Sequence, residues 1–103
     1  MNEMLEITVE KVHAHKDQYI LVDVREPHEL GPEGKIEGVA VATLGPDLGR
    51  FLTSADPTKE YVFICRSGCR SGQACEVAHA YGFQKVYNMT GGMIAWQTMI
   101  KNP

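Results

Sequence analysis

The sequence lacks the marks of several large classes of protein. Positive charge is not in excess, because 10 Lys and Arg stand against 13 Asp and Glu, for a net charge of −3. Nucleic-acid binders normally carry a basic stripe, and no apolar run approaches the roughly 18–20 residues of a membrane helix. The acidic segment Met1–Glu6 has neither the basic nor the apolar part of a signal peptide. We therefore expect a cytoplasmic protein with no nucleic-acid or membrane partner.

The chain also lacks internal repeats, low-complexity tracts and linkers rich in proline or serine. Its 103 residues match one domain, since single domains commonly hold roughly 100–150 residues. A chain of this length can bury about two thirds of the surface that its unfolded form exposes. We expect a single domain over residues 1–103, with a core from about residue 7 to residue 100.

The number of cysteines is small and odd. The chain has 3 of them, which excludes a framework in which every cysteine is paired in a disulfide. All of them lie between Cys65 and Cys75, with Cys69 between these two. This clustering fits reducing surroundings and a reactive thiol better than a structural bridge.

Short apolar runs alternate with helical patterns, which is typical of a mostly parallel sheet covered by helices on both faces. Two runs, Tyr19–Val22 and Tyr61–Ile64, are continuously apolar, as strands buried on both faces are. Weaker strand candidates are Val39–Val41, Val86–Tyr87 and an edge strand that starts at Ile7.

Helices are predicted from capping residues, turn residues and apolar spacing. They cover residues 9–16 with Thr8 as the N-cap, 27–30, 46–52, 71–81 and 93–101. The apolar face of the fourth consists of Ala74, Val77, Ala78 and Tyr81. In the last helix, Trp96 and Ile100 are expected to face the core, with Val62 and Ile64 as partners of the tryptophan.

Three segments that follow predicted strands should meet at one edge of the sheet, because ligands of parallel sheets bind beyond the carboxyl ends of the strands. They are Asp23–Arg25, Cys65–Arg70 and Asn88–Gly92. We expect Asp23 and Arg25 to order their turn through hydrogen bonds, as supporting residues without a chemical role. The carboxylates of this region are interpreted as a solvated surface; they are Glu26, Glu29 and Glu33.

The segment Cys65-Arg66-Ser67-Gly68-Cys69-Arg70-Ser71 carries the strongest chemical signal. A cysteine directly follows a buried strand, and a short loop leads into a helix near Ser71. The N–H groups of such a loop and the positive end of the helix can point into one concavity, while Gly68 permits a positive φ. Helix N-termini and neighbouring arginines, here Arg66 and Arg70, lower the pKa of a thiol, and the thiolate is the nucleophile. The same cradle would hold a sulfur oxyanion or a persulfide.

A buried cysteine is more often a small hydrophobe than a nucleophile. Here two arginines, a glycine and a helix start within a few residues favour a site, since buried arginines without an anion would be costly. We therefore predict Cys65 as the nucleophile and the loop as the substrate-binding segment. Cys75 is most simply a packing residue, and His13 and His15 point apart on their helix, which disfavours a metal site.

Several motifs together resemble a known family. The Cys-x4-Arg loop Cys65–Arg70, followed by Ser71, resembles the active loop of rhodanese-family sulfurtransferases. Asp23-Val24-Arg25-Glu26-Pro27-His28-Glu29 resembles the first signature of that family, and Gly91-Gly92-Met93-Ile94-Ala95-Trp96 resembles its last. The resemblance extends over nearly the whole chain.

This resemblance implies a three-layer α/β/α domain with a central, mostly parallel sheet. It also implies a two-step transfer of sulfane sulfur, in which Cys65 takes sulfur from thiosulfate or a persulfide and passes it to cyanide or a thiol. Such covalent catalysis predicts ping-pong kinetics and requires no metal or organic cofactor. The loop amides and Arg70 would stabilise the persulfide charge, and Arg66 would meet the anionic donor.

The residues leave alternatives open. The domain could instead be a sulfur carrier that accepts persulfide from a partner protein and turns over little small donor, or an inert interaction domain, although inert relatives generally lose the cysteine. Phosphatases related to the family have a Cys-x5-Arg loop, one residue longer, so the spacing of Cys65 and Arg70 favours sulfur chemistry. Two departures from the family pattern are Lys35, where a histidine is common, and Cys69, which could be a resolving thiol or a spectator.

Overall fold

The computed structural model describes residues 5–102. Its 5 strands form a single parallel sheet in the order β1-β5-β4-β2-β3. The strands are β1 (Leu5–Ile7), β2 (Ile20–Asp23), β3 (Ala40–Val41), β4 (Tyr61–Ile64) and β5 (Val86–Met89). The helices are α1 (Val9–Ala14), the 3-10 turn η1 (Lys16–Gln18), α2 (Pro27–Leu30), α3 (Pro46–Ser54), α4 (Cys69–Ala80) and α5 (Gly92–Lys101). The predicted α/β class with a parallel sheet is confirmed.

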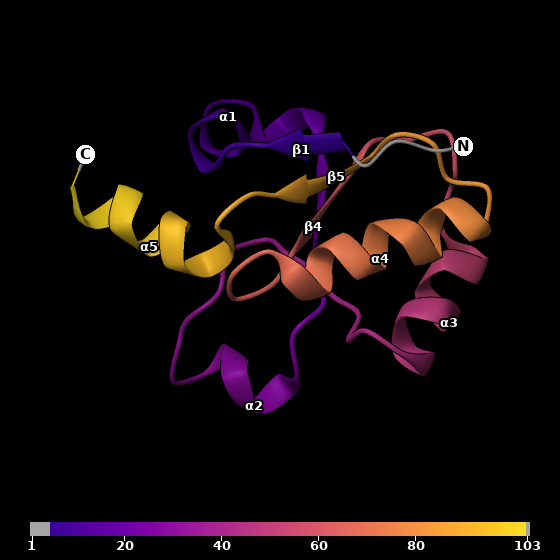
Figure 1. Ribbon diagram of the computed structural model, residues 1–103, viewed down its shortest axis with the longest axis horizontal. Coiled ribbons are helices and arrows are strands. Elements are labelled where there is room, and N and C mark those ends of the chain that lie inside the picture. Colours follow the sequence, from indigo (N-terminus) through magenta and orange to yellow (C-terminus); the bar gives the residue numbers. More distant parts are fainter. Residues whose placement is uncertain (1–4, 103) are drawn as a thin grey trace.

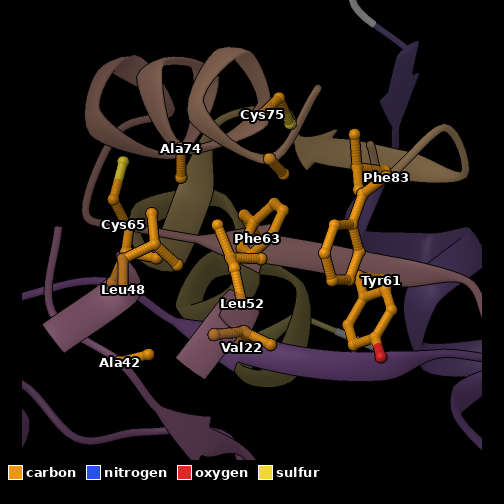
Figure 2. Packing of buried hydrophobic residues seen from close by; sticks show 13 residues of the cluster. Val22, Ala42, Leu48, Leu52, Tyr61, Phe63, Cys65, Ala74, Cys75 and Phe83 are labelled. Carbon is orange, nitrogen blue, oxygen red and sulfur yellow. The ribbon is translucent and has the colours of Figure 1, made fainter. Parts of the chain in front are cut away.

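The sheet separates two apolar clusters, which accounts for the three layers. Side chains alternate between the faces of a strand. Along β4, Tyr61 and Phe63 therefore join the cluster that α3 and α4 cover, shown in Figure 2. Val62 and Ile64 join the cluster beneath α1 and α5. Burial on both faces explains why this strand is apolar at every position.

The short helix α2 has a different place in the fold. It follows β2, begins at Pro27 and lies apart from the four longer helices in Figure 1. The capping box of Glu26 and Glu29 fixes its first turn. Since α2 buries no residue of its own, its position depends on polar contacts, which are described with the site below.

The structure corrects several predicted positions at the ends of elements. The helix predicted from Ser71 begins at Cys69, because Gly68 has φ +109° and the helix starts directly after it. Tyr81 and Ile100, predicted to face the core, are 48% and 49% exposed. Tyr81 follows the last helical residue of α4, and Ile100 lies in the last turn of α5, which projects past the sheet (Figure 1). Ile7 ends β1 rather than starting it.

Other predictions for the core are confirmed. Thr8 caps α1 by accepting a hydrogen bond from the Lys11 N–H. Trp96 is buried in the same cluster as Val62 and Ile64. Among the helices of residues 5–102, none combines the length and apolar character of a membrane span.

Candidate active site

The segments that follow β2, β4 and β5 come together at the carboxyl edge of the sheet, as the topology predicts. The Met93 N–H donates to the carbonyl of Cys65 at 2.9 Å, and the Ile94 N–H donates to that of Arg66 at 3.1 Å. The side-chain amide of Asn88 donates to the Gly68 carbonyl at 3.0 Å. The first turn of α5 and the end of β5 therefore hold the loop that follows β4.

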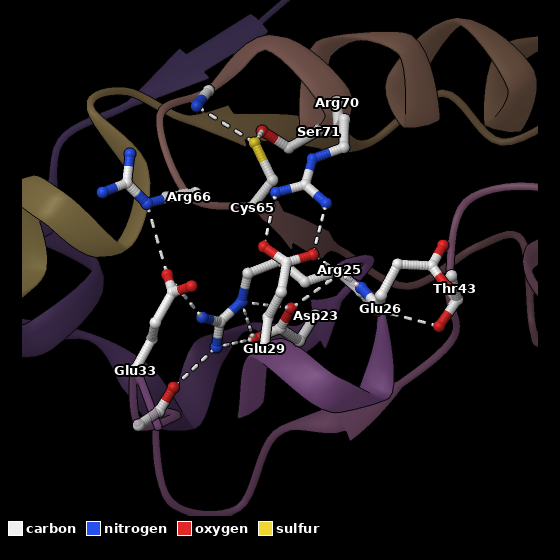
Figure 3. A network of polar contacts seen from close by, with 12 residues as sticks. Asp23, Arg25, Glu26, Glu29, Glu33, Thr43, Cys65, Arg66, Arg70 and Ser71 are labelled. Carbon is white, nitrogen blue, oxygen red and sulfur yellow. Dashed lines mark hydrogen bonds and ion pairs between the residues drawn. The ribbon is translucent and has the colours of Figure 1, made fainter. Parts of the chain in front are cut away.

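The Cys65 sulfur points into this loop. The backbone N–H of Gly68 donates to Sγ at 3.0 Å, and the hydroxyl of Ser71 lies 3.3 Å from Sγ (Figure 3). The residue is only 1% exposed, so the protein rather than water surrounds the thiol.

Opposing effects set the pKa of Cys65. Burial, the largest single effect, raises it, but hydrogen bonds from the Ser71 hydroxyl and from the backbone N–H groups of Ser71, Gly68 and Ser67 lower it. The hydrogen bonds together prevail, so the pKa lies below the ordinary value of a thiol. The N–H groups of the loop and of the helix start were predicted as donors from the sequence, whereas the Ser71 hydroxyl, the largest of the lowering causes, was not.

Ser71 connects Cys65 to β5. Its hydroxyl lies within hydrogen-bond distance of both the Cys65 sulfur and Oδ1 of Asn88, to which its single proton can be donated instead, and Asn88 is oriented by its bond to the Gly68 carbonyl. Both side chains are buried. Asn88 was predicted only as part of a converging segment, and its direct contact with Ser71 is a link that the sequence did not reveal.

Two glycines permit the close packing of this loop. Gly68 has φ +109°, a conformation that L side chains rarely adopt. Gly92 has φ +56°, and a Cβ at this position would lie 2.4 Å from the Cys65 carbonyl oxygen and 2.5 Å from that of Arg66. The first turn of α5 can therefore approach the loop only without a side chain at Gly92.

Arg70 forms a two-pronged ion pair with Glu29 of α2. Nη1 lies 2.6 Å from Oε1 and Nη2 lies 2.9 Å from Oε2 (Figure 3). Glu29 is only 11% exposed in its side chain, so its prediction as a solvated residue is wrong. The hydrogen bonds of Arg70 lower the pKa of Glu29 to about 2, and the pair raises the pKa of Arg70. This contact joins α2 to the start of α4.

Asp23 and Arg25 make the hydrogen bonds expected of them. Both are fully buried, with Nη2 of Arg25 2.9 Å from Oδ2 of Asp23 and the Arg25 N–H 3.0 Å from Oδ1. Nη2 also donates to the Gly34 carbonyl at 2.7 Å. The pair therefore ties the turn after β2 to the segment that follows α2.

Arg66 lies at the surface of the loop, opposite Glu33. Its Nε is 3.3 Å from Oε1 of Glu33, and the side chains are 58% and 40% exposed. Glu33 thus has a specific partner in addition to solvent. Glu26 is exposed, and its side chain caps α2.

The remaining candidates have simpler surroundings. Ser67 and Cys69 are exposed. Cys75 is buried, and burial raises its pKa to about 12. Both findings agree with its prediction as a packing residue. His13 and His15 are exposed, with the His13 ring edge-on to Trp96. Within residues 5–102, no three of the His, Cys, Asp and Glu side chains are grouped as metal ligands would be.

Comparison with known proteins agrees with this arrangement. The model of the rhodanese-like domain family matches residues 8–99. The chain belongs to the rhodanese-like domain family. The match spans both signature segments and the Cys65–Ser71 loop between them, so the resemblance seen in the sequence is confirmed.

Relatives and solved structures extend this result. YtwF of Bacillus subtilis is 43% identical over 88 residues, which cover 85% of this chain and 82% of the relative. A protein of Allochromatium vinosum named sulfurtransferase is 34% identical over 97 residues, covering 93% and 88%. The crystal structure of a rhodanese-related protein from Thermoplasma volcanium matches with a TM-score of 0.82 at 26% identity, covering 92% of each chain. The rhodanese-like fold and membership of a sulfurtransferase family follow.

Proposed function

We propose that this rhodanese-like domain moves sulfane sulfur from thiosulfate or a persulfide to a thiophilic acceptor through a persulfide on Cys65. The observation that carries the proposal is the cradle around Sγ, in which the Gly68 N–H donates at 3.0 Å and Ser71 lies at 3.3 Å. These donors lower the pKa of Cys65, and a thiolate is the form that attacks sulfur.

In the first step, the Cys65 thiolate attacks the outer sulfur of thiosulfate. A bond forms between the two sulfur atoms, and the S–S bond of the donor breaks, so that sulfite leaves with its electron pair. In the second step, cyanide or a thiolate attacks the outer sulfur of the persulfide. The Cys65 thiolate leaves and is ready for another cycle. Neither step requires an external oxidant or reductant.

The charge of the persulfide anion extends one atom beyond Sγ. The loop N–H groups that aim at Sγ are suited to this anion, because donors fixed before the reaction need no reorganisation. The positive charge of Arg70 adds to this stabilisation, since the pKa of Arg70 is raised chiefly by its hydrogen bonds with Glu29 and further by its electrostatic interaction with Cys65. Glu29 holds the guanidinium in place through both of its oxygens.

The small molecules that this chemistry requires are an anionic sulfur donor and a thiol or cyanide acceptor. A partner protein that exchanges persulfide with this domain would use the same cysteine. Because Cys65 is 1% exposed, a small donor reaches the sulfur with less rearrangement of the loop than a protein would need.

Intact-mass spectrometry after incubation with thiosulfate tests the proposal. The wild-type chain should gain the mass of one sulfur atom, and addition of cyanide should remove it. Cys65→Ser should gain nothing, whereas the matched variant Cys69→Ser should still gain it. Hydrolysis of an aryl phosphate without any gain of sulfur from thiosulfate would refute the assignment.

A further inference from the structure

Glu33 brings one carboxylate oxygen to two guanidinium groups beside the nucleophile. Its Oε1 lies 3.3 Å from Nε of Arg66 and 3.9 Å from Nη1 of Arg25 (Figure 3). Arg66 directly follows Cys65 in the chain. A negative charge of the protein itself therefore lies between two positive charges at the edge of the loop.

Arg25 has a polar atom that the rest of the protein leaves unsatisfied. Its side chain is fully buried, and its Nε and Nη2 donate to Asp23 and to the Gly34 carbonyl. Nη1, however, has no hydrogen-bond acceptor among residues 5–102. The 3.9 Å separation from Glu33 is too long for a hydrogen bond. Buried donors without acceptors are rare and call for an explanation.

A hollow opens next to this carboxylate. It has a volume of about 220 Å³, and its lining residues are Glu33, Arg66, Met93, Ile94 and Gln97. The N–H groups of Met93 and Ile94 donate to the carbonyls of Cys65 and Arg66, so the hollow adjoins the loop that holds the nucleophile. This volume is several times the roughly 30 Å³ that one water molecule occupies in the liquid, so the hollow has room for a small oxyanion.

Glu33 can leave this position by rotation of its side chain alone. Its backbone is held in place, since its N–H donates to the Glu29 carbonyl at 3.2 Å and its own carbonyl accepts from Gln97 Nε2 at 3.0 Å. Its side chain is 40% exposed. When the carboxylate turns into solvent, Arg25 keeps its ion pair with Asp23 and Arg70 keeps its ion pair with Glu29, so the positive charge of Arg66 is no longer offset.

We propose that Arg66 and Nη1 of Arg25 form the subsite for the oxyanion end of the sulfur donor, and that the Glu33 carboxylate occupies this subsite until the donor displaces it. The inference rests on the proposed function and narrows its donor to a small sulfur oxyanion. Guanidinium groups bind such oxygens by charge-assisted hydrogen bonds, and a sulfonate offers oxygens to both arginines and satisfies Nη1. Glu33 sets donor affinity by competition.

Equilibrium binding of thiosulfate to the Cys65→Ser chain tests this without turnover. Amide chemical shifts in NMR spectra give the dissociation constant for this chain and for the same chain carrying Glu33→Gln. The expected result is binding that is about fivefold tighter with Glu33→Gln, since an exposed ion pair contributes up to about 1 kcal/mol. The shifts should centre on Arg66 and Ile94.

The matched control is Glu37→Gln. Glu37 is exposed on the same segment and forms no ion pair within residues 5–102, so its removal changes the net charge equally and should leave affinity unchanged. Equal affinity with and without Glu33→Gln would overturn the subsite, as would an equal gain with Glu37→Gln. The proposed function fails separately: wild-type chain that gains no sulfur refutes it, whatever the NMR titration gives.

Discussion

Removing the Ser71 hydroxyl should raise the pKa of Cys65. In Ser71→Ala, the thiolate loses the side-chain hydrogen bond that is the largest of its lowering causes, while the donor at Gly68 remains. A hydrogen bond to a charged group contributes about 1.5–3 kcal/mol, and one pH unit corresponds to about 1.36 kcal/mol. The pKa should therefore rise by about 1 to 2 pH units.

The pH dependence of alkylation by iodoacetamide measures this pKa, since the thiolate is the reactive form. The assay uses a Cys69→Ser background, because Cys69 is exposed and would react as well. Cys75 does not react in this assay, because burial raises its pKa to about 12 and it stays a thiol in the pH range in which Cys65 ionises. Thermal unfolding followed by circular dichroism checks that the variant is folded.

One result would refute the reasoning. The Ser71 hydroxyl has a single proton, and Asn88 Oδ1 competes with the Cys65 sulfur for it. If the proton stays with Asn88 when the thiol ionises, Ser71→Ala leaves the pKa of Cys65 unchanged. An unchanged or lower pKa would mean that the backbone N–H groups alone stabilise the thiolate.

Three further predictions address the loop and its supports. Gly92→Ala should lower the free energy of unfolding by at least about 2 kcal/mol in urea titrations, because of the close carbonyls and the positive φ. The control Gly31→Ala has open space and should stay within about 0.5 kcal/mol; equal losses would contradict the packing argument. Glu29→Gln should lower the free energy of unfolding above pH 4.5, because Arg70 stabilises the ionised carboxylate of Glu29 and thereby lowers its pKa to about 2. The difference in free energy from the wild type should shrink as the pH falls towards about 2, where the carboxylate becomes protonated. A deficit that does not change with pH in acid titrations would show that the ion pair with Arg70 contributes nothing. Cys69→Ser should keep its turnover with thiosulfate and cyanide, because Cys69 is exposed and Cys65 is not; a large loss would indicate a resolving thiol.

The parts of the fold that depend on local pattern were predictable. The apolar run Tyr61–Ile64 gives the central strand at its observed bounds, because burial on both faces leaves a continuous apolar signature. The cradle was also predictable, since a cysteine after a buried strand and a glycine before a helix act through neighbouring backbone atoms. Only the start of α4 differed, by the two residues between Gly68 and Ser71.

Contacts between distant segments were not predictable from one sequence. Glu29 and Arg70 are 41 positions apart, and a glutamate on a short polar helix looks like any solvated residue until that helix has a position. The contact of Asn88 with Ser71 and that of Glu33 with Arg66 were not predicted for the same reason. The exposure of the Tyr81 side chain was not predictable either, because the apolar spacing in the sequence continues past the residue at which α4 ends.

The amides at the start of α5 bind the carbonyls of Cys65 and Arg66, which sets an order of events during synthesis. Ribosomes release the N-terminal part of a domain first. A nascent chain that has emerged only through β5 contains Cys65 and Asn88 but lacks the two amides of α5 that bind the loop. The site proposed for sulfur transfer is therefore complete only after translation of the final helix, and a chain that stops before Gly92 would lack both of these bonds even where the sheet can form.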